Sequence, residues 1–167
     1  FALISDCTNK ELDPRLFEAL PVLDRRSQLK RTWKGSYLLD DEGDSPDVIK
    51  EVLINAHSLF PGFRVIPFVQ PHRYSRLKSL MEEYADVLAS LSDEIILLPV
   101  YPAGEEPIPG IDSFALANTI ASKGFLGPLT VLDSHREAAD WIHAHHEGNN
   151  VFILLGPGDV WQVEHAL

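Results

Sequence analysis

Residues 63–100 read FRVIPFVQPHRYSRLKSLMEEYADVLASLSDEIILLPV, and this stretch predicts the fold. Its first seven residues, 63–69, form a short apolar run typical of a buried strand. Pro67 disfavours a central place for that strand, because proline lacks the N–H that a ladder uses. Apolar side chains then recur at helical spacing, at Leu77, Leu80, Met81, Tyr84, Ala85, Leu88 and Leu91. Residues 94–100 form a second apolar run, so the stretch predicts a strand, a helix and another strand.

The same alternation continues on both sides of this unit. Further strands are predicted at 35–40, 128–132 and 150–155, and further helices from Pro46, near 113–122, near 134–146 and at the end of the chain. Strands that alternate with helices predict an α/β domain whose mostly parallel sheet is covered by helices on both faces. Ligands bind such sheets beyond the carboxyl ends of the strands, so a site is expected in the loops after residues 40, 69, 100 and 155.

Composition narrows the classes of partner. The 167 residues include 25 acidic and 14 basic ones, and the net charge of −11 disfavours nucleic acid and anionic membranes as partners. A single cysteine, Cys7, excludes an intramolecular disulfide and favours a cytoplasmic location. The sequence opens on Phe1 in what reads as the middle of a helix. We therefore expect part of a longer cytoplasmic protein, in which residues 1–30 end a preceding domain and its linker, and residues 31–167 form the domain itself.

The loop after residue 69 carries the most distinctive chemistry. His72, Arg73 and Arg76 follow the strand where a helix begins. Helix N-termini attract anions, and arginine binds phosphate or carboxylate through two parallel hydrogen bonds. One interpretation is an anion clamp, and the other is a set of surface arginines paired with the acidic excess.

Three other loops leave their roles open. Glu105 and Glu106, in the Pro- and Gly-rich loop 101–110, could hold an amine or a metal, or could belong to a solvated connector. Asp40 and Asp41 could meet a ribose hydroxyl or Mg²⁺, or could belong to the acid-rich start of the next helix. Residues 156–159, Gly-Pro-Gly-Asp, stand where a nucleotide loop would, but the G-x-G-x-x-G pattern is incomplete.

Two classes of site are not expected. No phosphate loop of the form G-x-x-x-x-G-K-[ST] occurs in the sequence, so a domain that handles ATP here would need the main phosphate cradle from elsewhere. His143 and His146 share a helix face, but nothing nearby completes a coordination set, so no metal site is predicted.

Four motifs resemble the bacterial Mur ligases, specifically those that join L-alanine to UDP-N-acetylmuramate. QPHRYSR at 70–76 resembles the family pattern F-Q-P-H-R-Y-[ST]-R, and YPAGEEPIPG at 101–110 resembles Y-P-A-G-E-x-P-I-P-G. LGPGD at 155–159 resembles a terminal G-A-G-[DN] turn, and Arg25-Arg26 resembles the R-R that joins the central and C-terminal domains. The resemblance runs from about residue 12 to the end.

The resemblance implies the Rossmann-like, three-layer C-terminal domain of a three-domain enzyme, within residues 31–167. In such enzymes a central ATPase domain carries the phosphate loop and most Mg²⁺ ligands. The lactyl carboxylate of UDP-N-acetylmuramate is activated as an acyl phosphate, and the amine of L-alanine displaces phosphate. An isolated C-terminal domain would be inactive.

The same resemblance implies roles for individual residues. Arg26 and Asp41 would lie along ATP, and His72, Arg73 and Arg76 would meet the γ-phosphate, the acyl phosphate or the incoming carboxylate. The alanine side of the pocket would be shaped by Tyr101, Ala103, Gly104 and Glu105.

The first loop departs from the family pattern. The family has D-D-Y-[AG]-H-H-P where residues 40–46 read DDEGDSP, so acidic Glu42 and Asp44 replace aromatic and titratable side chains. Added negative charge should weaken the binding of a triphosphate. A degenerate, noncatalytic domain that binds a nucleotide or a partner therefore stays open as an alternative. An independent nucleotide-binding module is a third, which the incomplete glycine pattern disfavours.

Overall fold

Six strands form one sheet in the order β1-β2-β6-β3-β4-β5, in a computed structural model that describes residues 25–33 and 35–167. The strands are β1 (Gln28–Trp33), β2 (Ser36–Asp41), β3 (Arg64–Val69), β4 (Ile95–Leu97), β5 (Leu129–Val131) and β6 (Asn150–Leu155). The helices are α2 (Pro46–Leu59), α3 (Tyr74–Leu91), α4 (Ser113–Ser122), α5 (His135–His145) and α6 (Gln162–Ala166). All pairings are parallel except that of β1 with β2. The predicted α/β fold with a mostly parallel sheet is confirmed.

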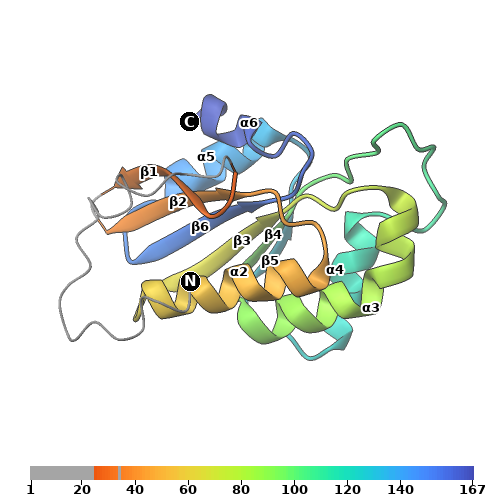
Figure 1. Ribbon diagram of the computed structural model, residues 1–167, viewed down its shortest axis with the longest axis horizontal. Helices are drawn as coiled ribbons and strands as arrows, with labels where there is room; N and C mark the ends of the chain where they lie inside the picture. The colour runs from red at the N-terminus through yellow and green to blue at the C-terminus, as the bar shows by residue number, and fades with distance from the viewer. Residues whose placement is uncertain (1–24, 34) are drawn as a thin grey trace.

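The sheet is covered on both faces, as predicted (Figure 1). On one side α2, α3 and α4 pack on a core that includes Leu39, Val65 and Val69. On the other side α5 and α6 pack on Leu38, Ile66 and Phe68, the alternate residues of the same strands. Three layers result, and the described helices include none long and apolar enough to cross a membrane.

The strand β1 was not predicted. Its sequence, QLKRTW, has no apolar run, and it is an edge strand that pairs antiparallel with β2 through an irregular register near Leu29 and Arg31. Pairing with a buried neighbour, rather than its own pattern, makes this segment a strand. The sheet therefore begins at Gln28, inside the range 1–30 expected to be domain end and linker. Residues 1–24 of that range, Cys7 among them, lie outside the described residues.

The expectation that Pro67 would keep its strand from the centre is wrong. β3 lies between β6 and β4, and Pro67 pairs in register with Ile153 of β6. Arg64 and Gln70 donate their N–H groups toward β6, to the carbonyls of Asn149 and Leu155 at 2.8 and 2.9 Å. Because N–H groups alternate in direction along a strand, the backbone nitrogen of Pro67 faces β4. Pairing with β4 starts only at Phe68. The missing donor of Pro67 therefore falls where the second ladder has not begun, and a central strand tolerates it.

Candidate functional site

The carboxyl edge of the sheet brings together the loops after β3 and β4. A parallel bridge joins His72 to Tyr101. Tyr101 donates its N–H to the Pro71 carbonyl at 2.8 Å, and Arg73 donates its N–H to the Tyr101 carbonyl at 2.9 Å. Two segments that the sequence singled out separately therefore form one continuous backbone platform.

His72 sits on this platform as a neutral imidazole. Its ring stacks on Tyr101 with centroids 5.6 Å apart and an interplanar angle of 8°. Burial, followed by the charge of Arg73, lowers the pKa of His72 below its usual 6.5. Nδ1 is buried, and in the described part of the chain it has no hydrogen-bond partner, although the carboxylate of Asp44 lies 3.9 Å away. The imidazole can therefore donate or accept a hydrogen bond without carrying charge at neutral pH.

The two arginines of the predicted clamp lie at the start of α3 but in different surroundings. Arg73 precedes the helix with a positive φ of 68° and is exposed. Arg76 lies in the first turn, and its guanidinium forms an ion pair with Asp44 from the loop between β2 and α2. Asp44, one of the two acidic residues by which the first loop departs from the family pattern, is therefore in direct contact with the predicted anion clamp.

The loop 101–110 returns to the same helix through Glu105. Its carboxylate accepts hydrogen bonds from the Ser75 N–H at 2.9 Å and the Ser75 hydroxyl at 2.6 Å. These two bonds, led by that from the hydroxyl, hold the pKa of Glu105 below its usual value. Ala103 and Gly104 turn the chain toward Ser75 with positive φ angles of 49° and 85°. Glu105 therefore caps α3 from a distant loop, while Tyr101 supports His72.

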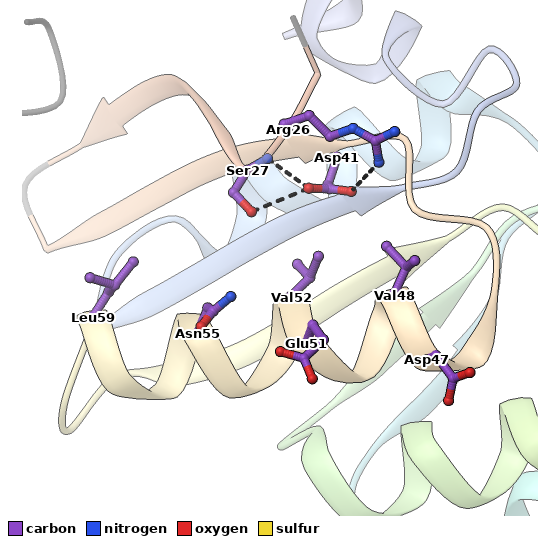
Figure 2. A pocket seen from close by; sticks show the side chains of 9 residues that line it. All are labelled: Arg26, Ser27, Asp41, Asp47, Val48, Glu51, Val52, Asn55 and Leu59. Carbon is purple, nitrogen blue, oxygen red and sulfur yellow. Dashed lines mark hydrogen bonds and ion pairs between the residues drawn. The ribbon is translucent and has the colours of Figure 1, made fainter. Parts of the chain in front are cut away.

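Asp41 and Arg26 line a second part of the edge, a pocket of about 330 Å³ between the start of β1, the end of β2 and α2. Figure 2 shows Val48, Val52 and Leu59 directed from α2 toward the strands, where Asp41 and Arg26 lie. The Asp41 carboxylate accepts hydrogen bonds from Ser27 N–H at 2.7 Å, Ser27 hydroxyl at 3.2 Å and Gly43 N–H at 2.8 Å.

The guanidinium of Arg26 is less constrained. It lies 3.1 Å from Glu42 and 4.0 Å from Asp41, and its side chain is 49% exposed. Arg26 can therefore turn to a ligand, whereas Asp41 shapes the pocket by fixing the backbone on either side of it.

A third group of polar side chains was missed by the sequence reasoning. The Gln70 amide donates to Asp159 at 2.7 Å and accepts from the Val160 N–H at 3.0 Å, and His135 lies 3.1 Å from the same aspartate. With Tyr101 and Ser134 these residues line a pocket of about 340 Å³. The position of Gln70 directly after a predicted strand could have indicated a site residue. Its partners His135 and Asp159 could not be identified from the sequence, because they lie 65 and 89 positions away.

The turn 156–159 packs tightly beneath this pocket. A Cβ on Gly158 would approach Gln70 Oε1 to 2.5 Å and Tyr101 Cγ to 2.6 Å, and one on Gly156 would approach the Gln70 carbonyl oxygen to 2.7 Å. Both glycines are therefore needed for close approach of two strand ends. Among the described residues, no group of three or more His, Cys, Asp or Glu side chains could hold a metal ion.

Fold and edge together define a three-layer α/β domain with cationic and polar groups at the carboxyl ends of parallel strands, the edge at which sheets of this kind bind their ligands. No family model matches the chain. A UDP-N-acetylmuramate–L-alanine ligase from Allorhizobium ampelinum is 42% identical over 143 residues, which are 86% of this chain and 30% of that protein. The corresponding ligase from Desulfatibacillum aliphaticivorans is 36% identical over 146 residues, 87% of this chain and 32% of its own length.

The crystal structure of the UDP-N-acetylmuramate–alanine ligase of Thermotoga maritima has the same fold, with a TM-score of 0.66 and 23% identity. It matches over 84% of this chain and 28% of its own. The chain belongs to the Mur ligase family. It spans about a third of the length of the curated relatives that it matches.

Proposed function

We propose that this chain is the C-terminal domain of a cytoplasmic, ATP-dependent ligase that joins L-alanine to UDP-N-acetylmuramate in peptidoglycan synthesis. The observation that carries the proposal is the platform of His72, Arg73 and Tyr101 at the carboxyl edge of the sheet, with Arg76 in the first turn of the adjoining helix. In this proposal the domain consists of residues 31–167 together with the start of β1 from Gln28, and a central ATPase domain of the same protein faces this edge.

The reaction requires charge stabilisation that this edge could supply. The lactyl carboxylate attacks the terminal phosphorus of ATP, the bond to ADP breaks, and an acyl phosphate results. The free amine of L-alanine then attacks the carbonyl carbon, and phosphate leaves as the C–O bond breaks. Negative charge develops on phosphoryl and carbonyl oxygens, and fixed cations stabilise it most when no reorganisation is needed. Arg73 is assigned to this role, with His72 as a neutral hydrogen-bonding group beside it.

The pocket beside Arg26 is assigned to ATP. Val48, Val52 and Leu59 give it an apolar wall of the kind that suits an adenine ring, and Arg26 offers a charge that can turn toward phosphate. Asp41 would act on the nucleotide through the loop that it fixes, because its carboxylate already accepts three hydrogen bonds. Mg²⁺ and the main phosphate cradle are assigned to the central domain.

The pocket beside Tyr101 is assigned to L-alanine. It offers the carboxylate of Asp159 for an ammonium group. Ala103, Gly104 and Glu105 would contribute by holding the loop that closes this pocket against α3.

A noncatalytic Mur-like domain that binds a nucleotide or a partner is the second candidate. The ion pair of Arg76 with Asp44 favours it, because an arginine already neutralised by its own chain is less available to substrate. Loss of ligase turnover in the parent protein would support this candidate.

The assigned role of Arg73 is tested in the full-length parent protein by Arg73→Ala, with Lys78→Ala, an exposed cation further along α3, as the matched control. Loss of a charge used in the transition state should lower kcat/KM by roughly 100-fold or more. Lys78→Ala should change it by less than about twofold. Equal activities of the two variants would contradict the assignment.

A further inference from the structure

The charges around the clamp cancel within this chain. Arg76 faces the carboxylate of Asp44, and the charge of Arg73 acts on the carboxylate of Glu105. Burial, followed by the charge of Arg73, lowers the pKa of His72, so its ring adds less positive charge than an exposed imidazole would. An incoming anion therefore meets two positive and two negative groups rather than a cluster of cations.

The two acidic groups differ in what they already bind. Glu105 is occupied by the N–H and hydroxyl of Ser75, so it belongs to the cap of α3. The Asp44 carboxylate instead points at the clamp, paired with Arg76 and 3.9 Å from Nδ1 of His72. Arg76 and His72 are two of the groups that a bound carboxylate or phosphate would use.

A hydrogen bond to the backbone carbonyl of Asp44 holds this residue in position. Its carbonyl accepts a hydrogen bond from the buried Tyr84 hydroxyl of α3, which ties the loop between β2 and α2 to the helix that carries Arg76. Burial raises the pKa of Tyr84 to about 12, so this hydroxyl stays a donor across the working pH range. Asp44 is therefore held at the clamp by a contact that does not involve its side chain.

We infer that Asp44 is an internal competitor for the anion site, which sets the affinity of this domain for carboxylate and phosphate ligands. An arriving anion must displace the Asp44 carboxylate from Arg76, while Arg73 stays available throughout. Arg73 therefore makes the first contact, and Arg76 joins only when Asp44 is displaced. This inference rests on the proposed function, because it takes the clamp as an anion site.

The test is a titration of the 167-residue chain with inorganic phosphate, followed by the side-chain Nε–H signals of Arg73 and Arg76 in NMR spectra. Asp44→Asn keeps the side-chain shape and the backbone carbonyl that Tyr84 binds. Glu83→Gln, at an exposed position of α3 outside both pockets, removes one carboxylate charge elsewhere on the helix that carries Arg76 and is the matched control.

Asp44→Asn should tighten the dissociation constant for phosphate about two- to fivefold, the range expected when a partly exposed ion pair stops competing. Glu83→Gln should tighten it by less than about 1.5-fold, because screened charges at a distance contribute little. Adding Arg76→Gln to Asp44→Asn should remove the gain, whereas Arg76→Gln alone should cost little. Equal tightening by the two single variants, or a gain that survives Arg76→Gln, would overturn the inference.

This readout separates the inference from the proposed function. Phosphate binding needs neither the central domain nor turnover. A tighter Asp44→Asn variant together with a parent protein that lacks ligase activity would refute the proposed function and leave the role of Asp44 intact.

Discussion

The contribution of Asp41 to the stability of the folded chain is large enough to measure. Its side chain is 4% exposed and accepts hydrogen bonds from both Ser27 groups and from the Gly43 N–H. Asp41→Ala would leave three donors without their acceptor, which should lower the free energy of unfolding by about 2 to 3 kcal/mol. Glu42→Ala, whose side chain is 39% exposed, should cost less than about 0.5 kcal/mol.

Urea denaturation of the 167-residue chain measures both values. Equal losses for the two variants would mean that Asp41 does not hold the pocket wall. The measurement also bears on the ATP assignment, because a carboxylate committed to its own backbone can act on a nucleotide only through the loop that it positions.

Residue by residue, the sequence predicted which side chains gather at the carboxyl edge better than it predicted their partners. His72, Arg73 and Tyr101 stand directly after strands, so periodicity alone places them at one edge. The ion pair of Arg76 with Asp44 could not be predicted, because it joins a helix residue to a loop residue 32 positions away, and their approach depends on how α2 and α3 pack. The contact of Gln70 with Asp159 could not be predicted either, because it joins positions 89 apart that meet only in the folded sheet.

Among the elements, α3 has an unusual N-terminus. Arg73 at its N-cap position gives no side-chain cap, and Glu105 supplies the acceptor from the loop after β4. Because the folded chain holds the pKa of Glu105 below its unfolded value, the stabilisation is present above the unfolded pKa and is lost as pH falls through the folded pKa.

Glu105→Gln should therefore lower the urea midpoint relative to the wild type at neutral pH. The gap should narrow as the pH falls through the lowered pKa of Glu105, where the wild-type carboxylate becomes protonated. Glu106→Gln, the exposed neighbour, should leave the midpoint near that of the wild type at each pH. A gap that stays constant with pH would show that the charge of Glu105 does not cap α3.

Strong periodicity also explains which elements were predictable. The amphipathic helices α2, α3 and α5 and the fully buried strand β6 carry patterns that their packing simply satisfies. β1 carries no such pattern, since its partly buried residues depend on β2 for their pairing. Pro67 is a case in which a local pattern gave a wrong prediction. A central strand tolerates this proline because the pairing of β3 with β4 starts only at Phe68.

At the scale of the whole molecule, the clamp and both pockets lie along one edge of the sheet. A reaction that uses ATP at this edge would need another domain to bind the phosphate groups. The sequence has no phosphate loop, and the chain spans about a third of its curated relatives. The 167-residue chain alone should therefore release no phosphate from ATP above background, whatever substrates are added.

The measurement that tests this account most directly uses the full-length parent protein with Mg-ATP, UDP-N-acetylmuramate and a panel of L-amino acids. Phosphate release is followed together with the mass of any ligated product. The account predicts a product with L-alanine, formed only by the parent protein and not by the 167-residue chain. A folded parent that yields no product with any amino acid would contradict it and favour a noncatalytic domain.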